Sequence, residues 1–377
     1  MSTRKICAAL AFAGLAALGA WAQEPVLADI PPYKPEFTCE GVLRIYGNWM
    51  RGNMVKLIAG FTKFHPACVV GSNFHTSSEG AIAGLYTGIS DIAPMGDDAK
   101  ITDMMPFYDT FHYTPTEISI AAGGAEARGS LWPAVILVHK NNPLTQLTKD
   151  EVARIFGSSR TGGWEVGPGA SHGLRYTAKY ARGPEKNIRT WDQLGFKGEY
   201  AGKPIQTYGY ISPGFKIYFE RHLNHWSQKW NENYKEYVET QQATKDDDGF
   251  KIASERMLEE LSKDKFGIGW GAWLHAKDYP GLRVMAIAEK EGGPYVAFNQ
   301  ATVRNRSYPL KRDYYIYVNK PLGRTLDPKV REFLRFCLSR EGQQIIQDHG
   351  VYNPMPVSYI DEQLKKLDTM GGSDAFK

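Results

Sequence analysis

The chain is short of cysteine, nearly balanced in charge and almost free of long apolar runs. It has 4 cysteines in 377 residues, and 45 basic against 41 acidic residues leave a formal net charge of +4. Proteins that bind nucleic acid usually carry concentrated basic charge, so we expect no nucleic-acid partner. Hydrophobic residues make up 42% and charged residues 23%, shares that are typical of soluble globular proteins.

Motifs of common metal-dependent and nucleotide-binding enzymes are missing as well. The sequence contains no HExxH, no CxxC and no Walker phosphate loop. Gly267, Gly269 and Gly271 do not form a dinucleotide fingerprint, and tight packing against Trp270 explains them better. We therefore expect no enzyme, no cofactor and no metal site.

The one long apolar run lies at the N-terminus. Residues 6–19 follow Arg4 and Lys5 and precede a small-x-small pattern that ends at Ala22. This arrangement is typical of a secretory signal peptide, and the run is too short for a membrane span. We predict a signal peptide at residues 1–22 and an exported mature protein.

Export would leave three cysteines in an oxidising compartment. Cys39 precedes the apolar run 42–46, and Cys68 precedes another apolar run. If these runs are neighbouring parallel strands, both cysteines lie at the same end of a sheet. We predict a disulfide between Cys39 and Cys68, and a buried free thiol at Cys337.

Beyond an irregular arm at residues 23–38, short apolar strands alternate with amphipathic helices. Strands are expected at 42–47, from 68, and at 132–139, 204–208, 266–270, 282–287 and 314–318. Helices are expected at 54–61, 81–85, 149–156, 213–223, 252–261, 328–337 and 341–349. The alternation predicts an α/β protein with parallel sheets covered by helices, and the length predicts two domains.

Two local patterns between these elements are informative. Thr148 with Glu151 three residues later is the capping box of a helix start. Residues 157–190 are rich in Gly, Arg and Tyr and have little periodicity, so they are predicted to form a long excursion.

Three consecutive hydroxyl residues, Thr76, Ser77 and Ser78, stand before a predicted helix and upstream of Asp91. A helix start attracts anions, because free N–H groups and the positive end of the helix dipole meet there. A carboxylate beside such a site repels an anion unless that anion carries a proton to donate. The stretch therefore favours a pocket for a protonated oxyanion with Asp91 as acceptor. The alternative is that a serine only caps the helix and Asp91 only caps the next turn.

Taken in order, several segments resemble the periplasmic phosphate-binding proteins of ABC importers, the PstS-like branch of the type II periplasmic binding protein fold. The resemblance covers roughly residues 40–357. The segments that carry it are GNWM at 47–50, HTSSEGAIAGLYTGISDIAPM at 75–95, NNPLTQLTKDEVARIF at 141–156, NIRTWDQLG at 187–195, YGYISPGFKIYF at 208–219, FGIGWG at 266–271, SYPLKRDYYIYVNKP at 307–321 and REFLRFCLSREGQQIIQDHGVYNPMP at 331–356.

The resemblance implies two α/β domains that close around a ligand by a hinge motion. The first domain would comprise residues 39–130 and 310–377, and the second residues 131–309. The chain would cross between them near 128–134 and 307–313.

The resemblance also implies a ligand set, since these proteins hold phosphate through N–H groups at helix starts, hydroxyls, one Asp and one Arg. Mapped onto this chain, the first loop and the hydroxyl loop supply Gly47, Asn48, Trp49, Thr76, Ser77 and Ser78. The acid maps to Asp91.

The fourth element departs from the pattern of an Arg followed by Ser-Gly-Thr at a helix start. This chain has no Arg there, so Tyr208 or Tyr210 takes its place, followed by Ser212 and Gly214. Pro213 also removes one N–H donor. The substitute cations considered are Arg51, Arg182 and Lys216.

The resemblance implies the periplasmic solute-binding component of an ABC importer, a monomer that binds phosphate or a related small anion and docks on an inner-membrane permease. Without the Arg fork, phosphate binding should be weak, which favours an organic anion or a phosphoester. The alternative is a sensor or interaction protein that keeps the fold without transport and has an altered ligand.

Overall fold

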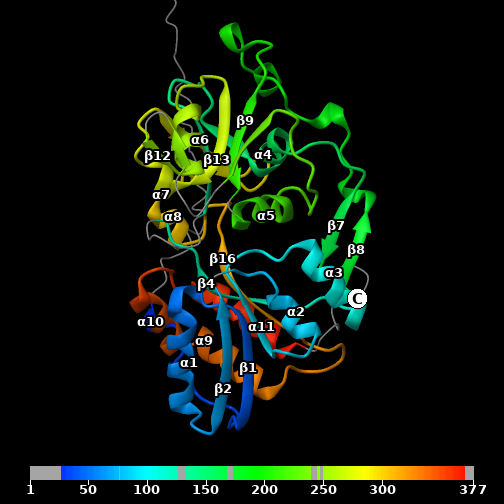
Figure 1. The fold of residues 1–377 in the computed structure, drawn as a ribbon, viewed down its shortest axis with the longest axis vertical. Helices are drawn as coiled ribbons and strands as arrows, with labels where there is room; N and C mark the ends of the chain where they lie inside the picture. Colours follow the sequence, from blue (N-terminus) through cyan, green and yellow to red (C-terminus); the bar gives the residue numbers. More distant parts are fainter. Residues whose placement is uncertain are drawn as a thin grey trace, which may run out of the picture.

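The computed structural model describes residues 27–75, 77–125, 133–167, 173–211, 213–238, 244–246 and 249–369. Within these residues two five-stranded sheets lie one above the other along the long axis of the molecule, each with helices packed against it (Figure 1). The predicted signal peptide at 1–22 lies outside the described residues. In the part of the chain that is described, no helix is both long and apolar enough to cross a membrane.

The first sheet has the strand order β2-β1-β3-β16-β4. Its strands are β1 (Gly41–Asn48), β2 (Cys68–His75), β3 (Ile92–Met95), β4 (Thr116–Ala122) and β16 (Asp313–Val318). The first three run parallel, and β16 returns antiparallel between β3 and β4. The ends of β1 and β3 therefore meet the beginning of β16 at one edge of the sheet.

Side chains alternate between the two faces of this sheet, as the two-residue period of a strand requires. On one face Ile92, Tyr314 and Ile316 pack with the helices α1 (Asn53–Phe64), α9 (Pro328–Leu338), α10 (Arg340–His349) and α11 (Val357–Asp368). On the other face Ala93 and Tyr315 pack with α2 (Ala81–Tyr86) and α3 (Ile101–Phe111).

The second sheet has the order β10-β9-β13-β5-β14. Its strands are β5 (Ala134–His139), β9 (Gln206–Ile211), β10 (Tyr234–Val238), β13 (Gly267–Ala272) and β14 (Leu282–Val284). Its core includes buried residues of α4 (Lys149–Phe156), α5 (Pro213–His222) and α6 (Ala253–Leu261). A short pair, β6 (Gln146–Thr148) with β15 (Ala286–Ala288), lies beside it.

Most of the predicted elements are present. The capping box is confirmed, because Thr148 Oγ1 accepts from the Glu151 N–H at 3.1 Å and the Glu151 carboxylate accepts from the Thr148 N–H at 2.7 Å. The helices α3 and α11 were not predicted. Pro106 lies inside α3, and an internal proline usually argues against a helix.

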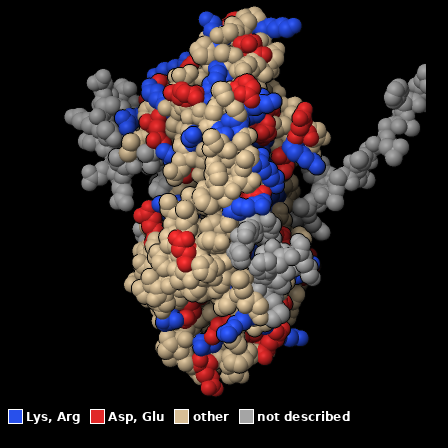
Figure 2. Space-filling model, turned by 90° about the vertical axis from the view of Figure 1, so that its right-hand side faces the viewer, with Lys and Arg blue, Asp and Glu red and all other residues tan. Residues whose placement is uncertain are grey.

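The predicted excursion contains a hairpin of β7 (Gly163–Val166) and β8 (Leu174–Thr177). Leu174 of the hairpin belongs to the hydrophobic cluster of α2 and α3, and Trp164 packs against that cluster. The hairpin lies beside α3, so a segment that follows β5 and α4 of the second sheet reaches the helices of the first (Figure 1). On this side basic and acidic side chains are interspersed (Figure 2).

The predicted return crossing at 307–313 lies between the two sheets. Tyr308 donates its hydroxyl to Ala134 O at 3.1 Å, and Ala134 N donates to Leu310 O at 3.1 Å. Most of the first crossing, predicted at 128–134, lies outside the described residues, and the domain boundaries at 130/131 and 309/310 stay predictions.

The predicted disulfide is absent, because Cys39 and Cys68 are both buried free thiols. The parallel strands do bring the two residues to the same end of the sheet, as expected. However, the register pairs Cys68 with Gly41, so Cys39 lies two residues before the position opposite Cys68. Cys337 is a buried free thiol, as predicted.

Replacing Leu174 by Asp should detach the hairpin from α2 and α3, because an unpaired charge buried in an apolar cluster costs several kcal/mol. We expect faster amide hydrogen exchange in β7, β8 and α3, with both sheets still protected. Lys186→Gln, at an exposed position outside the hairpin, is the control. Equal protection in the two variants would show that the hairpin does not depend on this contact.

Candidate functional site

The loop after β3 carries two acidic residues at the sheet edge that faces the second sheet. Ser78 Oγ accepts hydrogen bonds from the backbone N–H groups of Gly96 at 2.9 Å and Asp97 at 3.0 Å. Ser78 is buried, and the Asp97 carboxylate lies 3.2 Å from the guanidinium of Arg312. The serine thus fixes the loop in the position that turns Asp97 toward Arg312.

The start of α5, a helix of the second sheet's core, lies against the Asp97–Arg312 pair. Gly214 is the second residue of α5, and a side-chain carbon at this position would collide with Asp97 Oδ1 and Arg312 Nη2. Only glycine therefore allows the first turn of α5 to approach the ion pair so closely. The positive end of the helix dipole favours negative charge at this place.

Arg312 is buried, and its guanidinium also lies 5.0 Å from the ring centre of Phe215. Its Nε has no hydrogen-bond partner among the described residues. Burial raises the pKa of Asp97 above its ordinary value, although the Arg312 charge acts in the opposite direction. The pair therefore combines a fixed cation with an acid that holds its proton more readily than usual.

The end of β1 supports the same site. Asn48 Oδ1 accepts from the Met50 N–H at 2.8 Å, and its backbone oxygen accepts from the Tyr314 hydroxyl at 2.6 Å. Gly96 lies beside the Asn48 amide, so β1, β3 and β16 converge here. A side chain at Gly47 would collide with Pro94, which explains why β1 and β3 can approach so closely.

Of the predicted hydroxyl residues, only Ser78 is seen in this cluster. Ser77 is exposed, and its Oγ accepts from the Glu79 N–H at 3.0 Å. The N-cap of α2 is Gly80, without a side-chain hydrogen bond, so neither serine caps that helix. Thr76 and Ser212 lie outside the described residues, and Trp49 is 38% exposed near the end of β1.

Asp91 lies at the opposite end of β3 and outside this cluster, and its contact with the ligand stays a prediction. It accepts from the Arg44 N–H at 2.8 Å and from Arg44 Nη2 at 2.6 Å. Because Ile45 pairs with Ile92, Asp91 lies about 10 Å along the strand from the sheet edge described above. The acid that follows β3 is Asp97. Ligands bind at the carboxyl ends of parallel strands, so this rule could have identified it.

The two tyrosines predicted in place of the missing arginine lie outside this cluster. Tyr208 donates to Asp264 at 2.9 Å, and Tyr210 accepts from the Ala272 N–H at 3.2 Å. Both are buried in the core of the second sheet. Their hydroxyl groups therefore serve packing within that core.

Two of the substitute cations considered are also committed elsewhere. Arg182 donates to Ala153 O at 3.0 Å and to Ser158 O at 2.9 Å, and Lys216 pairs with Glu236 at 3.0 Å. Arg51 is exposed beyond β1 with φ 54°. The cation beside the acid is Arg312, which sequence reasoning missed because it belongs to the distant return strand.

The C-terminal end of α5 makes a second contact with the first sheet. Asp98 Oδ1 is 3.0 Å from Arg221 and 2.7 Å from His222 Nε2, and Arg221 also pairs with Glu117 at 2.7 Å. Although burial alone would raise the pKa of Asp98, His222 and Arg221 hold it well below its ordinary value. Helix α5 is therefore fastened to the loop after β3 at both of its ends.

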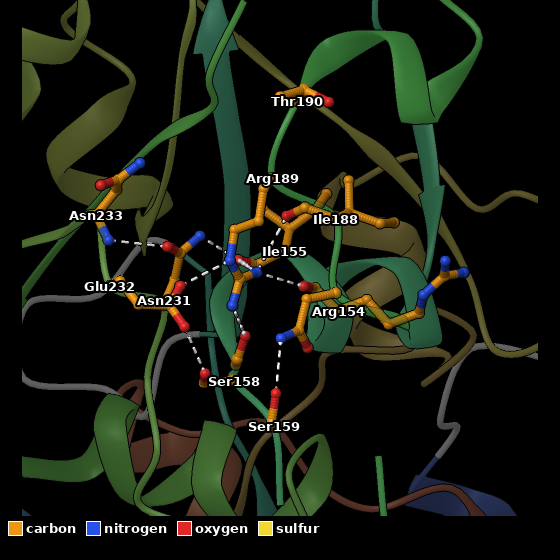
Figure 3. A network of polar contacts seen from close by, with 12 residues as sticks. Arg154, Ile155, Ser158, Ser159, Ile188, Arg189, Thr190, Asn231, Glu232 and Asn233 are labelled. Atoms are coloured by element: carbon orange, nitrogen blue, oxygen red, sulfur yellow. Dashed lines mark hydrogen bonds and ion pairs between the residues drawn. The ribbon is translucent and has the colours of Figure 1, made fainter. Parts of the chain in front are cut away.

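A further polar network has a structural role (Figure 3). Arg189 donates to Arg154 O and Gly157 O, both at 3.0 Å, and pairs with Glu232 at 2.8 Å. These carbonyls belong to the last turn of α4 and to its C-cap, where helices leave acceptors without partners. The network thus completes a helix end.

The letters GASHG at 169–173 match the spacing of a hydrolase nucleophile motif. That motif requires a sharp turn from a strand into a helix. The central residue of the match, Ser171, lies outside the described residues.

A family model matches more than half of the chain. The sequence model described as PBP superfamily domain matches residues 133–341. The phosphate-binding protein PstS of Pseudomonas aeruginosa is 25% identical over 370 residues, which are 97% of this chain and 99% of that protein. Protein SphX of Synechococcus elongatus is 23% identical over 211 residues, 55% of this chain and 50% of that protein.

Solved structures are similar at lower identity. PstS from Borrelia burgdorferi is 18% identical with a TM-score of 0.48, and the match covers 84% of this chain and 100% of the Borrelia chain. An ABC-type phosphate transport receptor from Vibrio cholerae is 16% identical with a TM-score of 0.46, at the same coverage.

Replacing Asp91 by Asn should lower the free energy of unfolding by about 0.5–1 kcal/mol at neutral pH, the usual contribution of a partly exposed ion pair. Burial raises the pKa of Asp91, but the hydrogen bonds from Arg44 outweigh this effect and lower it. The contribution is therefore present above the unfolded pKa of about 4 and is lost as the pH falls through the folded pKa.

Denaturant titrations of both proteins at neutral pH and at about pH 3 measure this effect, and the difference in unfolding free energy should shrink at the lower pH. Anion binding should be unchanged. A variant that folds normally but binds phosphate poorly would return Asp91 to the ligand site.

Proposed function

Since the chain belongs to the PBP superfamily, we propose that it is the solute-binding component of an ABC importer and binds phosphate or a related small anion between its two sheets. It acts in the periplasm as a monomer that delivers the anion to an inner-membrane permease, and it catalyses no reaction. The near full-length likeness to a phosphate-binding protein supports this role.

The observation that carries the proposal is the Asp97–Arg312 pair against the first turn of α5. Arg312 offers the planar set of N–H donors that matches an oxyanion, and it takes the part of the arginine missing near Tyr210. The N–H groups at the start of α5 and the Ser78 hydroxyl would complete the donor set.

Asp97 has the role first assigned to Asp91. A carboxylate beside a bound anion is tolerated when the anion carries a proton that the carboxylate can accept. Phosphate retains a proton at neutral pH, whereas sulfate does not. Asp97 would therefore favour phosphate over sulfate, while Arg312 supplies the positive charge for either ion.

Replacing Arg312 by Gln should weaken phosphate binding about 100-fold or more, because two hydrogen bonds to a charged group contribute about 3 kcal/mol or more. Isothermal titration of ligand-free protein measures the change. Lys216→Gln, which removes a cation from the same region of α5, is the matched control and should bind normally.

Removing Arg312 also leaves Asp97 partly buried without its partner, which can destabilise the fold. The double variant Asp97→Asn with Arg312→Gln removes both charges and keeps the packing. Normal phosphate affinity in a folded single or double variant would contradict the proposed site.

Replacing Asp97 by Asn should reduce the discrimination between phosphate and sulfate. The amide has the same size but can donate a hydrogen bond to an unprotonated oxygen. The affinity for sulfate, measured by its competition with phosphate in titrations at neutral pH, should rise at least tenfold relative to the unaltered protein. Unchanged exclusion of sulfate would mean that Asp97 does not read the proton of the ligand.

A further inference from the structure

A separate cavity of about 420 Å³ lies beside the connection between the sheets. It is bounded by the second half of α5, by residues 289–296 and by residues 306–315. Its size falls within the range of small-molecule sites.

The cavity and the Asp97 site lie on opposite sides of the same strand. Along the beginning of β16, Arg312 and Tyr314 face Asp97 and Asn48, whereas Asp313 and Tyr315 line the cavity. This alternation follows from the two-residue period of an extended chain. The cavity is therefore distinct from the anion position.

One buried polar group of the cavity lacks a partner among the described residues. Ser307 Oγ is buried and makes no hydrogen bond there. Tyr218, which is 1% exposed, lines the same cavity. Buried hydroxyl groups are almost always hydrogen-bonded, so the unpaired serine hydroxyl points to an occupant.

Among the described residues that line the cavity, one basic side chain has no carboxylate partner. Lys149 pairs with Glu289 at 2.7 Å, and Arg306 pairs with Asp313 at 2.5 Å. Among the described residues Lys311 has no carboxylate partner, and its ammonium donates only to the carbonyl of Arg306 at 3.3 Å.

His222 at the cavity edge is engaged with the buried Asp98. Among the described residues, the cavity thus carries one uncompensated positive charge next to the side chains of Tyr218 and Ser307.

We propose that this cavity binds a small hydroxylated monocarboxylate. One spare cation matches a single negative charge, and a phosphate dianion would leave a charge without a partner. The hydroxyl groups of Tyr218 and Ser307 match the hydroxyl groups of such a ligand. This site is separate from the proposed anion site. It is lined by residues of both sheets, so its occupant would affect the hinge motion between them.

Isothermal titration with D-gluconate and D-lactate, in the presence of saturating phosphate, tests the site on the full protein. D-glucose serves as the neutral comparison of similar size. We expect saturable binding of at least one carboxylate, unaffected by phosphate, and at least tenfold weaker binding of glucose. Failure of both carboxylates to bind, or their displacement by phosphate, would overturn the proposal.

Two variants locate the binding. Lys311→Met should weaken carboxylate binding at least tenfold, and Tyr218→Phe, which keeps the ring and removes only the hydroxyl, should weaken it several-fold. Lys56→Met, on the exposed face of α1, is the matched control. Thermal melting checks that each variant is folded.

Phosphate titration of the same variants separates the two sites. Both variants should bind phosphate as the unaltered protein does. Carboxylate binding that is unchanged in Lys311→Met and Tyr218→Phe would overturn this proposal. If the unaltered protein does not bind phosphate, that result contradicts only the proposed anion site.

Discussion

The contact between Asp97 and Arg312 organises the space between the two sheets. It requires Ser78 to hold the loop after β3, and it requires a glycine at position 214 so that α5 can approach. A partly buried ion pair contributes little net stability, because desolvation cancels much of the attraction. Its value is positional, since it places a donor fork and an acceptor at one helix start.

The local structure of the chain could be read from the sequence because it depends on near neighbours. Helix α4 begins where Thr148 and Glu151 form a capping box, and β1 and β2 are parallel as their apolar runs indicate. The site depends instead on contacts between distant segments. Asp97 and Arg312 are 215 residues apart, and only the antiparallel return of β16 brings them together.

Where each predicted residue lies depends on strand direction and register, which residue type alone does not show. Asp91 and Asp97 flank the same strand, yet only the second follows its carboxyl end. Tyr208 and Tyr210 stand where an arginine was expected, but packing around β9 commits their hydroxyl groups to Asp264 and Ala272. Cys39 and Cys68 share a sheet end but not a register position.

Helix α5 links these features, because its first turn meets Asp97 and its last turn meets Asp98 through Arg221 and His222. Separating the sheets would break both contacts at once, since one rigid helix carries them. The exposed charges would then be hydrated, so the net cost of opening is smaller than either contact alone suggests. A ligand shifts such an equilibrium only by its difference in affinity for the two states. An anion at the start of α5 has that difference, because Arg312 and the helix N–H groups surround it only when the sheets are together.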